Sequence, residues 1–115
     1  MIHEEDNIQI NCVRWFELQY PQLALLLHHS PNGGKRTKFE AINFKRMGTR
    51  RGFPDLILCF PSKRCHGLFI EMKTPKGRQQ PSQRKWQERC EWAGYKYIIC
   101  RSFDDFRNEI NAYLR

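Results

Sequence analysis

The stretch "GFPDLILCFPSKRCHGLFIEMKTPKGRQQPSQ", residues 52–83, contains two apolar, strand-like runs and only two acidic residues, Asp55 and Glu71. Each carboxylate belongs to one of the apolar runs, whereas basic residues are spread along the rest of the stretch. A carboxylate in an apolar strand costs free energy unless a cation or hydrogen bonds compensate it. The stretch therefore predicts two adjacent strands that carry a functional pair of carboxylates.

The composition bounds the class of protein. A chain of 115 residues with 40% hydrophobic residues fits one domain, residues 1–115, with a small core. No apolar run reaches the ~18 residues that cross a bilayer, and the N-terminus "MIHEEDNIQ" is acidic, unlike a signal peptide. We expect a soluble, cytoplasmic protein that is not secreted. The five cysteines are scattered and odd in number, which predicts reduced thiols, and Cys65-His66 has no CxxC partner that would indicate zinc.

Positive charge is concentrated on both sides of Asp55. The chain carries a net charge of +8, and residues 31–51 contain seven basic residues against one acidic residue. Residues 61–89 are also strongly basic. One interpretation is a solvated, lysine-rich surface; the other is a surface that binds the phosphates of a nucleic acid. The concentration of charge in residues 31–51 favours the second interpretation.

Hydrophobic spacing and turn residues predict the order helix, strand, helix, strand, strand, helix, strand, helix. This order is typical of an α/β fold with a mixed central sheet flanked by helices. The expected elements are a helix over 4–19, a strand over 23–29, a helix over 38–47 capped by Thr37, strands over 55–60 and 67–73, a helix capped by Ser82 and running through Ala93, a strand over 95–100, and a last helix capped by Ser102.

The two strands of the opening stretch predict a metal site. Side chains alternate along a strand, so Glu71 and Lys73 share one face, about 6–7 Å apart at the backbone. Asp55 begins the neighbouring strand, and pairing of the two strands would bring the carboxylates together. Two carboxylates repel unless a cation lies between them, and hard oxygen ligands with open water positions suit Mg²⁺. We expect Mg²⁺, with Mn²⁺ as a substitute, and Lys73 to orient or deprotonate a water or to stabilise phosphate charge.

The same residues match a known signature. Pro54-Asp55 followed by Glu71-Met72-Lys73 fits the PD-(D/E)xK nuclease motif, and the chain resembles the VRR-NUC family (virus-type replication-repair nucleases) of that superfamily over most of its length. The matching pieces occur in the same order and at the same spacing. They are "EEDNIQ", "HSPNGG" with Arg36, "MGTRRGFPDL", "GLFIEMKTPKGR", and "PSQRKW" before "GY". The compact length resembles the stand-alone viral or phage form, which would act in the host cytoplasm.

The resemblance implies a restriction-endonuclease-like core and a metal-dependent phosphodiesterase. In that family Asp55 and Glu71 would be metal ligands, Lys73 the catalytic lysine, and the Met72 backbone carbonyl a further ligand. A glutamate of the first helix often joins the metal site in this superfamily.

Two further residues are candidates for the site. Glu5 shares a helical face with apolar residues of the first helix, which favours it over Glu4 as the additional metal ligand; for both, a solvated helix start is the alternative. Gln83 lies in the first turn of its helix and can reach back toward the strand that carries Glu71, as the corresponding glutamine does in relatives. A capping or surface role is the alternative for Gln83.

Basic and polar residues around the site are candidate DNA contacts. Lys76 and Arg78 lie in the loop just after Lys73 and are interpreted as phosphate contacts, with solvated loop charge as the alternative. Three further candidates match a family pattern, namely His29, Asn32 and Arg36. Three others precede the metal site in the chain and are expected to guide the nucleic-acid backbone, namely Arg46, Arg50 and Arg51. The alternatives for His29 and Asn32 are a hydrogen-bonded strand end and a turn.

These expectations favour a Mg²⁺-dependent DNA endonuclease of replication, recombination or repair that hydrolyses phosphodiester bonds in one step. The alternatives are a non-catalytic DNA-binding module, which the intact Asp55, Glu71 and Lys73 argue against, and a basic interaction protein. Some stand-alone relatives are homodimers that resemble Holliday-junction resolvases, which need two active sites for paired nicks, so the resemblance implies a homodimer that cuts branched DNA. A two-fold assembly also fits a chain of 115 residues, which offers little surface to hold a four-way junction. A flap nickase or a less selective nuclease is the alternative. No stretch is typical of a base-reading helix, and no small-molecule cofactor is expected.

Overall fold

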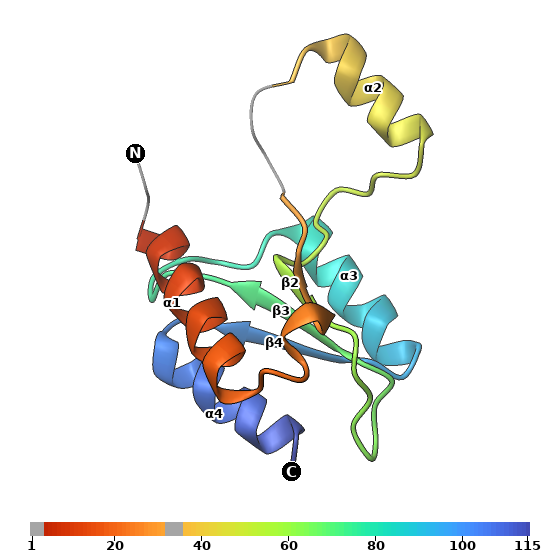
Figure 1. The fold of residues 1–115 in the computed structure, drawn as a ribbon. Helices are drawn as coiled ribbons and strands as arrows, with labels where there is room; N and C mark the ends of the chain where they lie inside the picture. Colours follow the sequence, from red (N-terminus) through yellow and green to blue (C-terminus); the bar gives the residue numbers. More distant parts are fainter. Residues whose placement is uncertain (1–3, 32–35) are drawn as a thin grey trace.

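The computed structural model describes residues 4–31 and 36–115. The chain forms a single sheet with helices on both faces, in the predicted order (Figure 1). The elements are α1 (Glu4–Gln19), the 3₁₀ helix η1 (Ala24–Leu26), β1 (Leu27–His29), α2 (Lys38–Arg46), β2 (Leu56–Leu58), β3 (Leu68–Met72), α3 (Pro81–Trp92), β4 (Lys96–Cys100) and α4 (Phe103–Tyr113). The prediction of an α/β fold with a mixed central sheet is therefore confirmed.

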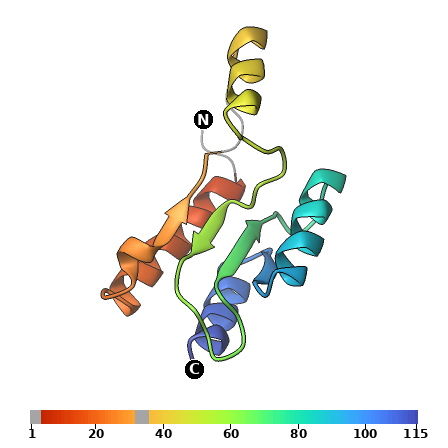
Figure 2. The same cartoon turned by 90° about the vertical axis from the view of Figure 1, so that its right-hand side faces the viewer.

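The sheet has the order β1-β2-β3-β4, in which β1, β2 and β3 are antiparallel neighbours and β3 pairs with β4 in parallel. The parallel pair needs a crossover connection, which α3 supplies. Figure 2 shows that α1 and α4 lie on one face of the sheet and α3 on the other. All five residues of β3 are buried, as expected for a strand covered on both faces.

Side-chain alternation divides the core into two layers. Leu68, Ile70 and Met72 of β3 pack with buried residues of α1 and α4, such as Phe16 and Phe106. The opposite face of β3 packs toward α3 in a smaller cluster that contains Phe69, Tyr97 and Cys90. Glu71 lies on this second face, so its carboxylate is directed to the α3 side of the sheet. All five cysteines are free thiols, as predicted.

Three elements differ from the expectation. The run over 55–60 forms a strand only at Leu56–Leu58. The apolar run over 23–29 forms a strand only at its last three residues, because a 3₁₀ turn closed by the Leu26 N–H on the Leu23 carbonyl takes up its middle. Helix α3 begins at Pro81 rather than after Ser82. Gln80 is its N-cap, and proline suits the first helical position because it has no N–H to leave unpaired.

Helix α2 projects from the body of the fold (Figure 1). Its start is the predicted one: Thr37 and Glu40 form a reciprocal capping box. None of its side chains is buried, and Phe39 and Met47 are 81% and 72% exposed. In the described residues, no helix is long and apolar enough to cross a membrane.

Candidate active site

The pairing of β2 with β3 brings the two carboxylates of the opening stretch together. Leu56 lies opposite Ile70, and one further step of this antiparallel register places Asp55 opposite Glu71. The Met72 backbone N–H donates to Asp55 Oδ2 over 2.7 Å, which anchors the Asp55 side chain to β3. The sequence-based prediction that these carboxylates approach each other agrees with this arrangement.

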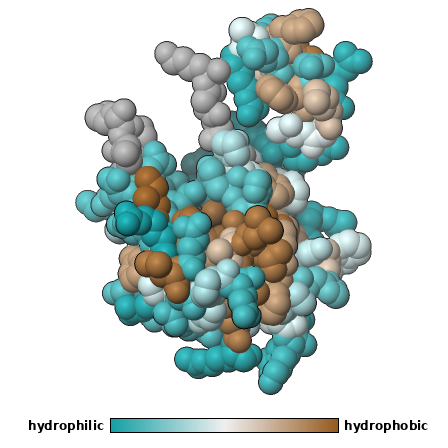
Figure 3. Space-filling view, in the orientation of Figure 1, coloured by the Kyte–Doolittle hydropathy of each residue, from teal (hydrophilic) through white to brown (hydrophobic). Residues whose placement is uncertain are grey.

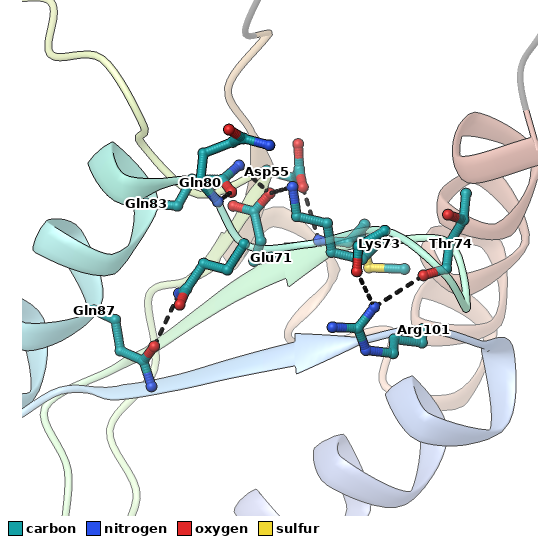
Figure 4. Close-up of polar contacts among 11 residues, drawn as sticks. Asp55, Glu71, Lys73, Thr74, Gln80, Gln83, Gln87 and Arg101 are labelled. Atoms are coloured by element: carbon teal, nitrogen blue, oxygen red, sulfur yellow. Dashed lines mark hydrogen bonds and ion pairs between the residues drawn. The ribbon is translucent and has the colours of Figure 1, made fainter.

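Glu71 has two partners on its Oε2 atom. Gln83 Nε2 donates to it over 2.8 Å, and Lys73 Nζ lies 3.7 Å away (Figure 4). The Gln83 amide is itself oriented, because its Oε1 accepts the Gln80 backbone N–H over 2.7 Å. The helix cap of α3 thus directs an N–H donor at the carboxylate. Glu71 Oε1 is buried and receives no donor among the described residues.

The electrostatics of the site centre on Glu71, which is only 2% exposed. Burial raises the pKa of Glu71 to about 8; the negative charge of Asp55 and a hydrogen bond with its carboxyl act in the same direction, and Lys73 opposes them. The charge of Glu5 also raises this pKa slightly. A buried carboxyl of this kind either keeps its proton or needs a cation close by.

A pocket opens over the pair. Its lining consists of Glu5, Arg51, Gly52, Phe53, Asp55, Glu71, Lys73, Gln80, Ser82 and Gln83. Glu5 is half-buried and lines this pocket, whereas Glu4 is exposed and does not, which favours Glu5 of the two expected candidates. Within residues 4–31 and 36–115, no three His, Cys, Asp or Glu side chains are grouped closely enough to hold a metal by themselves. The part of Glu5 in metal binding therefore stays a prediction.

Lys73 is followed by a turn that folds against it. The Gly77 N–H donates to the Thr74 carbonyl over 3.0 Å, and a Cβ on Gly77 would lie 3.5 Å from Lys73 Cδ. Arg101, directly after β4, donates from Nη1 to the carbonyls of both Thr74 and Gly77 (Figure 4). Lys76, on this turn, is exposed, as a phosphate contact must be.

The other predicted DNA contacts lie in different surroundings. His29 Nδ1 is 2.8 Å from the Asp55 carbonyl, so it has a local partner at the start of β2. The Arg36 guanidinium stacks on the Phe44 ring at 4.6 Å. Four further candidates are exposed, and one of these, Arg51, lines the active-site pocket; the four are Arg46, Arg50, Arg51 and Arg78. Asn32 lies outside the described residues.

Sequence reasoning missed three residues that build the site. Gln80 orients Gln83, Arg101 holds the turn after Lys73, and Gly52 passes α3 so closely that a Cβ would lie 2.6 Å from the Ser82 carbonyl carbon. Gln80 is not among the residues that usually cap a helix N-terminus, so the sequence contains no sign of this cap. The contacts of Arg101 and Gly52 join segments at least 24 residues apart, and local sequence holds no signal for them.

Comparison with known proteins places the chain in a family and matches its fold. The model of the VRR-NUC domain family matches residues 3–104. A solved structure described as "VRR_NUC domain protein" superposes with a TM-score of 0.84 at 31% sequence identity, covering 98% of this chain and 89% of the other. Among curated proteins, none matches the chain.

Proposed function

This chain belongs to the VRR-NUC domain family of nuclease-type domains, and on that premise we propose that it is a metal-dependent DNA endonuclease that hydrolyses phosphodiester bonds. The observation that carries the proposal is the buried Glu71, paired with Asp55 and flanked by Lys73, at a pocket that Arg51 also lines. A structural salt bridge would not need two opposed carboxylates in an otherwise basic region.

The residues present fit a hard divalent cation. Asp55 and Glu71 offer carboxylate oxygens. Glu71 Oε1 is buried and has no donor among the residues that the structure describes, which is an unfavourable state that a cation would relieve. We propose Asp55, Glu71 and the Met72 carbonyl as ligands, with Glu5 nearby, and Mg²⁺ as the metal, replaceable by Mn²⁺. When bound, such a metal lowers the pKa of a coordinated water and polarises the phosphate.

The chain's own residues would then supply orientation and charge. The Lys73 ammonium lies at the Glu71 edge of the pocket, where it would stabilise the negative charge that develops on the attacked phosphate. Gln83 holds the Glu71 carboxylate in position through its fixed amide. Lys76, Arg78 and Arg51 would contact flanking phosphates, because all three are exposed near the pocket or the turn beside it.

We further propose that the enzyme acts as a homodimer on branched DNA, with a four-way junction as the first candidate substrate. The support is physical: a small domain has little surface to hold a junction, and two sites related by a two-fold axis could nick two strands symmetrically. The alternatives are a nuclease without junction selectivity and a non-catalytic DNA-binding module.

The test is cleavage of a labelled four-way junction beside linear duplex, flap and single-stranded controls, in Mg²⁺, Mn²⁺ or EDTA. Lys73→Met keeps the aliphatic stem and removes the ammonium, and we expect it to lower cleavage about 100-fold to 1,000-fold. Lys76→Met is the matched control, which should weaken DNA binding but leave the cleavage rate at saturation.

Paired nicks in the junction alone, lost in EDTA, would support the full proposal. Metal-dependent cutting of every substrate would remove junction selectivity only. DNA binding without any cutting would favour the non-catalytic module.

A further inference from the structure

A second basic hollow lies along α3, beside the active-site pocket. It is lined by Arg50, Arg51, Ser82, Lys85, Trp86 and Arg89, and we call it the α3 cleft. Four of these six residues are cationic and none is acidic. The α3 cleft shares Arg51 and Ser82 with the active-site pocket, so the two hollows are neighbours on the surface.

Core contacts hold the two walls of the α3 cleft together. Trp86 Nε1 donates to the Arg51 carbonyl over 3.1 Å, and the Trp86 ring packs edge-on against Phe53 with 4.8 Å between centroids. Gly52, at a positive φ of 86°, packs directly on the backbone of Ser82. The arginines before β2 and the lysine and arginine of α3 are therefore fixed at one place by the fold, rather than gathered by chance on a mobile surface.

The cations of the α3 cleft lack acidic partners. In the described part of the chain, none of Arg50, Arg51, Lys85 and Arg89 is within ion-pair distance of a carboxylate. On the same helix, by contrast, Arg84 pairs with Glu88 at 3.6 Å and does not line the cleft. Four uncompensated positive charges around one hollow repel one another, and a polyanion relieves that repulsion.

We propose that the α3 cleft binds the phosphodiester backbone of the substrate DNA on one side of the scissile phosphate, with Lys85 and Arg89 as phosphate contacts. Figure 4 shows α3, with Gln83 and Gln87, on one side of Glu71, and Thr74 on the other. The α3 cleft and the turn after Lys73 therefore grip the DNA from opposite sides of the site. This inference rests on the proposed function, and it specifies the path of the bound strand, from the α3 cleft across the active site to the turn after Lys73.

The test compares two charge-matched double variants in a Lys73→Met background, so that DNA is bound but not cut. Lys85→Gln with Arg89→Gln removes two charges from the α3 cleft. Arg84→Gln with Arg107→Gln removes two exposed, ion-paired charges elsewhere. Affinity for a labelled duplex and for a four-way junction is measured from 50 to 200 mM salt, where each lost phosphate contact reduces the salt slope by about 0.9.

We expect the α3-cleft variant to reduce the slope by about 1.8 and to weaken binding at least about tenfold at low salt, with an unchanged melting temperature. The control variant should change the slope by less than half as much. Equal salt slopes for the two variants would overturn the proposal that the α3 cleft binds DNA, while leaving the endonuclease proposal intact. Failure of the parent protein to bind or cut any DNA would defeat both proposals together.

Discussion

At Glu71 the stability of the fold and the chemistry of the site make opposite demands. Glu71 lies in the middle of the sheet at 2% exposure, where a hydrophobic side chain would stabilise the fold better. The burial that raises its pKa to about 8 makes the ionised form costly in the metal-free protein. A binding site that tolerates such a group gains a ligand whose charge is compensated only when a cation arrives.

This conflict predicts how stability depends on pH. In the unfolded chain Glu71 ionises near 4.5, and in the folded, metal-free protein near 8. Between these values the folded state keeps a proton that the unfolded state has lost, so the free energy of unfolding decreases as the pH rises. We expect the melting temperature of the metal-free wild type to fall from pH 5 to pH 8 relative to that of Glu71→Gln, measured by calorimetry in EDTA.

The same ionisation should govern metal binding. Because a metal displaces the proton of Glu71, the apparent affinity for Mg²⁺ should rise about tenfold per pH unit up to about pH 8, measured by titration calorimetry. Glu71→Gln should lose this dependence together with most of the affinity. Parallel pH profiles of stability for the wild type and Glu71→Gln would show that the residue does not titrate in this window.

Gly52 supports a third prediction at the residue scale. Its φ of 86° is unfavourable for any other residue, and a Cβ would also collide with the Ser82 backbone at 2.6 Å. Gly52→Ala should therefore cost at least about 2 kcal/mol of unfolding free energy, and it should lower cleavage by displacing Arg51 and Asp55. Gly48→Ala is the control, because Gly48 also has a positive φ of 108° but has open space around it.

Chemical denaturation of both glycine variants separates the two effects. Gly48→Ala should lose only the free energy of holding a non-glycine residue at a positive φ, about 1 kcal/mol, and it should cleave DNA normally. If the two variants lost equal stability, the close approach of residue 52 to α3 would not matter.

At the scale of elements, the sequence predicts what depends on local pattern and fails where distant contacts decide. The alternation in β3 and the start of β2 place Asp55, Glu71 and Lys73, because strand pairing follows from two adjacent apolar runs. Strand length is less predictable, because the runs over 23–29 and 55–60 each pair over only three residues. In the first run the 3₁₀ turn Ala24–Leu26 takes up the middle. The contacts of Arg101 could not be predicted from the sequence, because both of its acceptors are backbone carbonyls, which every residue has.

Arg101 predicts a role for the turn between β3 and α3. Its guanidinium holds the carbonyls of Thr74 and Gly77, and the turn packs on the Lys73 stem. Arg101→Gln should let the turn relax and displace the Lys73 ammonium, lowering kcat about tenfold to 100-fold. The Mg²⁺ affinity should not change, because Asp55 and Glu71 are held by other contacts; steady-state kinetics and calorimetry measure the two quantities.

Arg107→Gln is the control for Arg101, since it removes an exposed arginine from the same region of the chain. A loss of DNA affinity with an unaltered kcat would instead make Arg101 a phosphate contact. A normal kcat and normal affinity would show that the turn needs no such clamp.

At the scale of the whole molecule, contacts within one chain do not explain what stabilises α2. A helix of nine residues is only marginally stable in water, even with the capping box at Thr37. Most of its apolar side chains are well exposed, and Figure 3 shows hydrophobic surface on the projecting α2 region at the upper right. A short helix with several exposed apolar side chains gains stability from a partner, and a second copy of the chain fits the homodimer proposed above.

We therefore expect α2 to contribute to the dimer interface. Phe39→Gln with Met47→Gln should convert a dimer into a monomer in analytical ultracentrifugation, because the two side chains are 81% and 72% exposed in one chain. Leu18→Gln with Leu25→Gln is the control, since these residues are at least as exposed, at 83% and 92%, but lie away from α2 and from its C-cap Met47. A wild type that sediments as a monomer would rule out the dimer. A dimer that survives the α2 variant would move the interface to another face, and paired nicking of a four-way junction should then survive as well.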